Sequence, residues 1–123
     1  MSQAFLIAGA LFGGTGVLLG AFGAHALKTR LTPEALSSWD TAVTYQLFHA
    51  LALLFAGLLA RSVTHPAVTV AGLSWIVGLL LFSGSIYVLA IGGPRFFGPV
   101  TPIGGLALIA GWASMLVAVA KQV

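Results

Sequence analysis

Charged residues divide this chain into four long uncharged stretches. The stretches without Asp, Glu, Lys or Arg are residues 1–27, 41–60, 62–94 and 96–120. A helix needs roughly 20 apolar residues to cross a bilayer core about 30 Å thick, and each stretch is long enough to supply them. The pattern therefore predicts an all-α fold, an integral membrane four-helix bundle. The expected spans cover about residues 4–27, 41–60, 67–91 and 103–120.

The segment between the first and second spans predicts an additional short helix. Thr32 fits a helix N-cap, Pro33 fits the first helical position, and Glu34 favours the positive end of the new helix. A helix from Pro33 through the whole second span would be about 42 Å long, which exceeds the bilayer core. We therefore expect a short interfacial helix at residues 33–39, with Trp39 in the aromatic belt.

Small residues recur at helical spacing in the first and fourth spans. In the first span they are Gly9, Gly13, Gly16, Gly20 and Gly23. In the fourth span Gly104 and Gly111 belong to a similar stripe, which follows an N-cap pattern at Thr101 and Pro102. Helices in lipid associate through close backbone contact, which small residues permit. The stripes therefore predict that these two helices pack on each other, or that one stripe contacts a second copy of the chain.

Composition and charge narrow the class further. Of 123 residues, 59% are hydrophobic and 6% are charged, whereas a soluble domain carries about 25% charge. We therefore expect residues 1–123 to form a single transmembrane domain. Five basic and two acidic residues give a net charge of +3, but the basic residues are scattered. We expect them to contact lipid headgroups and do not expect nucleic acid as a partner. The lack of cysteine excludes disulfides, thiolate catalysis and cysteine-based metal sites.

The candidate polar site lies toward one end of the first two spans. Its residues are His49, Tyr45, Gln46, His25 and Asp40. Tyr45 and Gln46 precede His49 by four and three residues, so all three can share one helix face. An ionisable residue inside a membrane is a functional candidate, and a histidine can carry a proton or sense pH. In the structural alternative, neutral His49 and Gln46 hydrogen-bond to neighbouring helices and hold the bundle together.

His25 and Asp40 are expected near the same membrane surface. His25 points away from the glycine stripe, so it either meets His49 or lies among the lipid headgroups. Asp40 is expected to pair with Lys28 or Arg30, and the alternative is a proton-entry carboxylate. These residues lack a diagnostic metal-ligand spacing, and no hydrolase or phosphate-loop motif is present. We therefore expect no metal, no cofactor and no catalytic residue.

Four segments resemble the signatures of a known family. They are GAFGAHALK at residues 20–28, TAVTYQLFHALAL at 41–53, LFSGSIY at 81–87 and TPIGG at 101–105. In this order, over essentially the whole chain, they resemble the YgdD/YwdK-like family of small inner-membrane proteins, a domain-of-unknown-function class. Ala26 stands where many members have Gly, which concerns packing only. The resemblance implies a four-span protein of the bacterial inner (plasma) membrane, and it implies no established activity.

Three function classes follow from these observations. The first is a non-enzymatic accessory, structural or lipid-interacting membrane protein, supported by the small-residue stripes. The alternative is a small oligomeric transporter or channel in which Tyr45, Gln46 and His49 line a polar path. The third is a membrane enzyme or redox protein, such as one holding haem between His25 and His49. The expected partners are membrane lipids, together with a second copy of the chain or another membrane protein.

Overall fold

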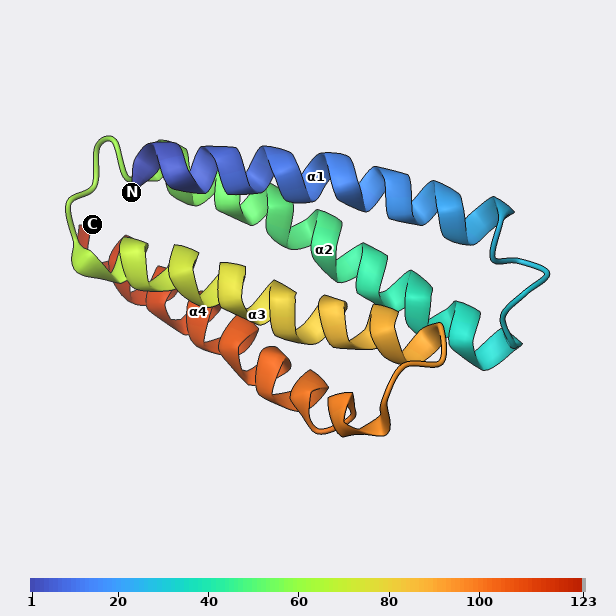
Figure 1. Cartoon of the computed structure of the whole chain (residues 1–123). Coiled ribbons are helices and arrows are strands. Elements are labelled where there is room, and N and C mark those ends of the chain that lie inside the picture. Colours follow the sequence, from blue (N-terminus) through green and yellow to red (C-terminus); the bar gives the residue numbers. More distant parts are fainter. Residues whose placement is uncertain (123) are drawn as a thin grey trace.

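Four long helices make up the fold (Figure 1). The computed structural model describes residues 1–122, and this part of the chain contains no strand. The long helices are α1 (Ser2–His25), α2 (Pro33–Leu59), α3 (Pro66–Ala90) and α4 (Val100–Gln122), and a short 3-10 helix, η1 (Arg95–Phe97), precedes α4. All four long helices are long and apolar enough to cross a membrane. The predicted all-helical fold, with four helices of membrane-spanning length and apolarity, is confirmed.

The start of α2 follows the sequence prediction, but the separate interfacial helix does not appear. The Thr32 side chain accepts a hydrogen bond from the Ala35 backbone N–H at 3.1 Å, with Pro33 in the first turn. Residues 33–39 are the first turns of α2, which continues unbroken to Leu59. After Pro33 no Gly or Pro occurs until Gly57. Nothing in that stretch interrupts the backbone hydrogen bonds of the helix.

Trp39 lies inside the bundle and not among lipid headgroups. Its side chain is 5% exposed, and its indole Nε1–H donates a hydrogen bond to the Leu19 backbone oxygen at 2.9 Å. The indole covers Gly23 of α1, where an added Cβ would lie 2.6 Å from the ring. The glycine leaves room for the Trp39 ring, so the expectation of an aromatic-belt position was wrong.

The fourth helix also begins earlier than its sequence pattern indicates. It starts at Val100, so Thr101 lies within its first turn and is not its N-cap. The Thr101 hydroxyl is instead hydrogen-bonded to the Ser85 hydroxyl of α3. This bond joins the first turn of α4 to the last turns of α3.

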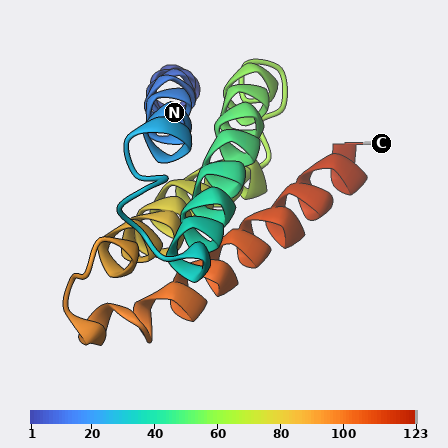
Figure 2. The same cartoon turned by 90° about the vertical axis from the view of Figure 1, so that its right-hand side faces the viewer.

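Each helix packs mainly on its neighbour in the sequence. The close pairs are α1 with α2, α2 with α3, and α3 with α4, and α1 and α4 lie at opposite edges of the bundle (Figures 1 and 2). Their small-residue stripes therefore do not pack on each other, contrary to one of the two expectations. The connecting loops are short, and short loops make successive helices antiparallel neighbours.

The two stripes are used within the two helical hairpins. In α1, Gly9 and Gly16 lie against Leu54 and Leu47 of α2. In α4, Gly104 lies against the α3 backbone at Phe82, and Gly111 lies against the Trp75 indole of α3. Gly13 and Gly20 also face α2, with Ala50 and Val43 nearest to an added Cβ. The stripes thus set how closely each hairpin closes.

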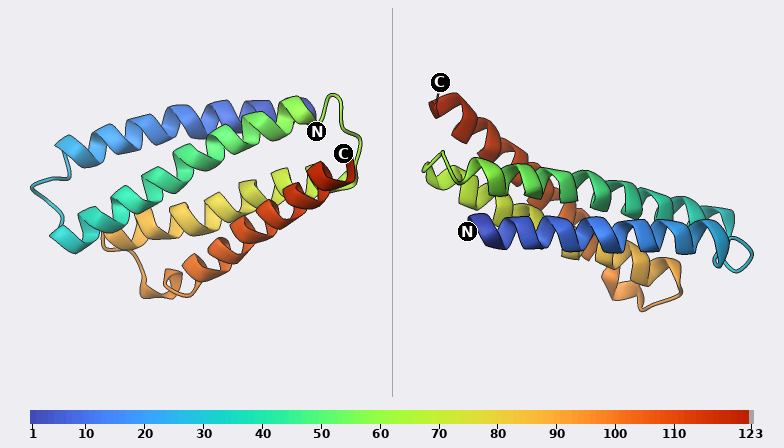
Figure 3. Two further views of the ribbon diagram at one scale, coloured as in Figure 1. Left: turned by 180° about the vertical axis from the view of Figure 1, so that it is seen from behind. Right: turned by 90° about the horizontal axis from the view of Figure 1, so that it is seen from above.

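The second helix is central. Half of the residues in the apolar 18-residue segment of α2 are buried, compared with 17% in the corresponding segment of α1 and 28% in those of α3 and α4. Figure 3 shows α2 running between α1 and the α3–α4 pair. Large hydrophobic side chains cover the outside of the bundle, including Leu18 at 70% exposed on α1 and Leu116 at 70% on α4. This apolar exterior suits contact with lipid.

Candidate functional site

The buried polar side chains of the bundle lie on α2 and α3, and those of α2 are the two largest. Gln46 and His49 are 4% and 5% exposed, and they lie one turn apart near the middle of the helix. A buried polar group in a membrane must find its hydrogen bonds within the protein. Their partners therefore show what each residue does.

Gln46 connects three helices. Its side-chain nitrogen donates to the Phe12 backbone oxygen at 3.0 Å and to the Thr15 hydroxyl at 2.9 Å, both on α1. Its side-chain oxygen accepts a hydrogen bond from the Tyr87 hydroxyl of α3 at 2.6 Å. Three of the four hydrogen bonds available to the amide are thus made. Gln46 fixes the relative positions of α1, α2 and α3, with Ser83 of α3 adding a bond to the Ala42 backbone oxygen at 2.8 Å.

His49 connects α2 to α4 through a single side chain. Its Nδ1 lies 2.8 Å from the Tyr45 backbone oxygen, and the Trp112 indole Nε1–H donates to its Nε2 at 3.0 Å. A carbonyl oxygen can only accept and an indole N–H can only donate. His49 is therefore a neutral imidazole with its proton on Nδ1, and both of its ring nitrogens are occupied.

An aromatic cluster surrounds this histidine. The Trp112 ring lies 4.6 Å from the Trp75 ring between centroids, and the His49 ring lies 5.8 Å from Trp112 and 6.2 Å from Trp75. Trp75 is fully buried, and its indole N–H has no hydrogen-bond partner among the described residues. The three rings join α2, α3 and α4 at one level of the bundle.

A cavity of about 360 Å³ opens beside His49, between α2 and α4. Its lining residues are Thr44, Tyr45, Phe48 and His49 of α2 and Trp112 of α4. Phe48 and Trp112 are 66% and 44% exposed, so the cavity faces the lipid side of the bundle. A separate, smaller cavity of about 210 Å³ lies beside Gln46, between α1 and α3.

The structure divides the predicted polar cluster. His49 and Tyr45 lie at the α2–α4 cavity, where the Tyr45 ring packs on Phe82 at 4.7 Å, but Gln46 is directed toward α1 and α3. The two destinations differ because residues three apart in a helix are rotated about 60° from each other. The three side chains therefore do not form one polar row.

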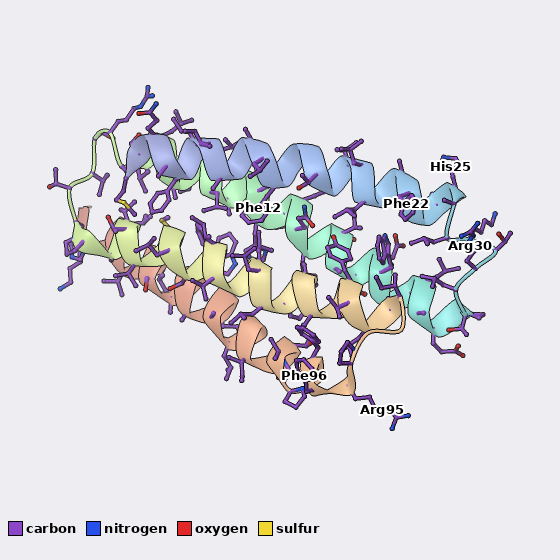
Figure 4. The ribbon with its side chains drawn as sticks, in the orientation of Figure 1. Phe12, Phe22, His25, Arg30, Arg95 and Phe96 are labelled. Carbon is purple, nitrogen blue, oxygen red and sulfur yellow. The ribbon has the colours of Figure 1, made fainter. Side chains whose placement is uncertain are left out.

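His25 and Asp40 do not join this site. Both side chains are exposed, and His25 points outward at the end of α1 (Figure 4). Within residues 1–122, no hydrogen bond or ring contact joins His25 to His49, and no ion pair joins Asp40 to Lys28 or Arg30. Of the two expectations for His25, the structure shows the position at the surface.

Sequence reasoning missed Trp112, the hydrogen-bond partner of His49. A usable signal existed, because tryptophan in membrane helices is enriched at the interfaces, whereas Trp75 and Trp112 lie near the middles of their spans. The N–H of a buried tryptophan usually finds an acceptor within the protein, as the Trp112 N–H does at His49. Both tryptophans arrive near His49 only through the packing of α3 and α4.

Comparisons with known proteins agree on one family. Residues 19–105 match the sequence profile of DUF423, described as a protein of unknown function. The chain is 42% identical to the UPF0382 membrane protein SH2409 of Staphylococcus haemolyticus over 119 residues, 97% of each chain. It is 39% identical to the UPF0382 membrane protein YwdK of Bacillus subtilis over 120 residues, 97% of this chain and 98% of that one. A UPF0382 membrane protein of Schizosaccharomyces pombe is 44% identical over 117 residues, 88% of this chain and 94% of that one. No solved structure matches the chain.

Proposed function

This chain belongs to the DUF423 family of membrane proteins, whose function is unknown, so its role must be inferred from its structure. We propose that it is a non-enzymatic, lipid-interacting protein. The family confirms the resemblance to YwdK-like proteins. We place the protein as a multi-pass component of the bacterial inner membrane, where its ligands are the bilayer lipids. The α2–α4 cavity is the proposed entry point for an apolar lipid chain.

The cavity itself carries this proposal. Its volume, about 360 Å³, falls in the range of small-molecule sites, which are mostly apolar clefts with a few placed polar groups. Phe48, Tyr45 and Trp112 supply aromatic walls, and Thr44 supplies a hydroxyl. The cavity lies within the part of α2 and α4 that crosses the bilayer, so lipid tails surround its opening.

His49 supports this role as a positioning residue. Its hydrogen bond from Trp112 holds the α4 wall of the cavity at a fixed distance from α2. A general base needs a free lone pair within reach of the proton that it takes. The lone pair of His49 Nε2 is occupied by the Trp112 N–H, so His49 is not arranged to activate the Thr44 or Tyr45 hydroxyl.

The transporter alternative has less support from the geometry. A polar path would need Tyr45, Gln46 and His49 to line one passage. Gln46 instead forms hydrogen bonds with Phe12, Thr15 and Tyr87, away from the cavity beside His49. That cavity is lined mainly by aromatic rings. These features favour an apolar ligand over an ion.

The test is lipid retention in a matched pair of variants. Thr44→Phe fills the cavity, whereas Val17→Phe adds the same ring on α1, where Val17 is 62% exposed to lipid. The protein is extracted with polymer into native nanodiscs and released in a mass spectrometer, and co-released lipids are counted. We expect the wild type and Val17→Phe to retain a lipid that Thr44→Phe loses. Equal retention by all three proteins would contradict the proposal.

A further inference from the structure

A third cavity, at the end of the bundle, lies on the face of α2 that also borders the cavity at His49. Its volume is about 410 Å³, and it is bordered by Glu34 and Ser38 of α2, Ile86 and Leu89 of α3, and Thr101 of α4. The first turns of α2 and α4 meet the last turns of α3 there. This end carries the two loops that hold Arg30 and Arg95, so it lies at a membrane surface (Figure 4).

The chemistry of this end cavity differs from that of the cavity at His49. Glu34 contributes a carboxylate, and Ser38 and Thr101 contribute hydroxyl groups, while no Lys or Arg is among the described residues that line it. Glu34 and Ser38 are exposed, and within residues 1–122 Glu34 forms no ion pair. A carboxylate with a neighbouring hydroxyl accepts hydrogen bonds from an ammonium group.

The two cavities lie along one row of α2. Glu34, Ser38, Tyr45 and His49 are separated by four, seven and four residues, which places them on one helix face. Exposed Thr41 lies on the same row between the two cavities. At 1.5 Å per residue, the row from Glu34 to His49 is about 22 Å long. One leaflet of a bilayer, headgroups included, is also about 20–22 Å thick.

We propose that these two cavities together hold one phospholipid with a primary ammonium headgroup, of the phosphatidylethanolamine type. The ammonium lies against Glu34 and Ser38, one acyl chain follows α2 past Thr41, and its end enters the cavity at His49 and Trp112. The phosphate, which links the ethanolamine to the glycerol, lies between the ammonium and the acyl chain, near the end of the bundle that carries Arg30 and Arg95. The inference rests on the proposed lipid-interacting function and specifies the lipid class, the leaflet and the orientation.

The test measures which headgroup the protein selects. The full-length protein is reconstituted in nanodiscs with equal parts of phosphatidylethanolamine, phosphatidylglycerol and phosphatidylcholine, and its retained lipid is identified by native mass spectrometry. We expect the wild type to enrich phosphatidylethanolamine by roughly two- to five-fold, the effect typical of a partly exposed ion pair. Glu34→Gln should abolish the enrichment, and Glu34→Lys should shift it toward phosphatidylglycerol.

Asp40→Asn supplies the matched control. Asp40 is also an exposed carboxylate on the early part of α2, but it does not border the end cavity, so its variant should keep the wild-type preference. The helical circular dichroism of each variant shows that the bundle is intact. Retained lipid without headgroup preference, or a preference that survives Glu34→Gln, overturns this inference and leaves the proposed function standing. If the wild type retains no lipid that Thr44→Phe loses, the proposed function fails, and this inference fails with it.

Discussion

Gln46 and His49 lie three residues apart on α2 and are almost equally buried, yet they serve different parts of the molecule. Gln46 makes three hydrogen bonds that join α1, α2 and α3. His49 makes one hydrogen bond to another helix, from a tryptophan that is 44% exposed and borders an open cavity. The hydrogen bonds show that the Gln46 side of α2 holds three helices together, and we propose that the His49 side shapes a place for a ligand.

The largest loss of stability is expected from a bulky side chain at Gly16, where the lack of a side chain lets α1 approach Gln46. An added Cβ at Gly16 would lie 2.7 Å from Leu47 and 3.4 Å from the Gln46 side-chain nitrogen. Gly16→Leu should therefore separate α1 from α2 and lower the free energy of unfolding by about 3 kcal/mol, the upper part of the range for overpacking. Unfolding in mixed micelles of increasing SDS content, followed by circular dichroism, measures the change.

Gly14 provides the matched control for this substitution. An added Cβ at Gly14 meets nothing within 4 Å. Gly14→Leu should therefore leave the unfolding midpoint near that of the wild type. Equal losses in both variants would show that the α1–α2 contact around Gln46 is not what the leucine at Gly16 disrupts.

Removing the Gln46 side chain tests the stabilising half of the comparison. Gln46→Leu introduces a side chain of similar size but removes the hydrogen bonds with Phe12, Thr15 and Tyr87. Interhelical hydrogen bonds in membrane proteins contribute about 0.6 kcal/mol on average and at most about 1.7 kcal/mol. We expect a loss of roughly 2 kcal/mol in the same unfolding assay, with lipid retention unchanged. A stable variant that has lost its lipid would reverse the roles assigned to Gln46 and His49.

Removing the hydrogen bond between His49 and Trp112 should lower the stability by less than removing the Gln46 side chain does. A double-mutant cycle with His49→Ala and Trp112→Phe isolates the coupling of the two side chains. We expect a coupling energy of about 0.6–1.7 kcal/mol, the magnitude of one interhelical hydrogen bond. Both single variants should also release lipid more readily, because the α4 wall of the cavity is no longer held. Strictly additive stability changes would show that the two side chains do not interact, which would contradict the assigned hydrogen bond.

The smallest effect is expected at the third ring of the cluster. The Trp75 indole N–H has no hydrogen-bond partner among the described residues, unlike Trp39 and Trp112. Removing a buried donor that is not hydrogen-bonded costs little and can stabilise a protein. Both Trp75→Phe and Trp39→Phe leave a cavity where the larger ring was. Only Trp39→Phe also loses a hydrogen bond, to Leu19, so Trp75→Phe should lower the free energy of unfolding by less. A Trp75 variant less stable than the Trp39 variant would contradict this ranking.

Local features of the sequence were sufficient for the helices and for one of their starts. Long uncharged stretches predict membrane spans because span length is set by bilayer thickness, and the Thr32–Pro33 pattern marks the beginning of α2. The same local pattern failed at Thr101, because that hydroxyl bonds to Ser85 on another helix. The prediction for Trp39 was wrong for a related reason, because the space at Gly23 of another helix admits the indole into the bundle.

The sequence by itself determined that this protein is a bundle of four apolar helices, that small residues mark the close-packing faces of α1 and α4, and that Gln46 and His49 are the polar residues most in need of partners. Only the tertiary structure decided which helix each face meets and which residues complete the hydrogen bonds. Periodicity is a property of one helix, whereas the partners Tyr87 and Trp112 lie 41 and 63 residues further along the chain. They reach α2 because the loops fold α3 and α4 back against it.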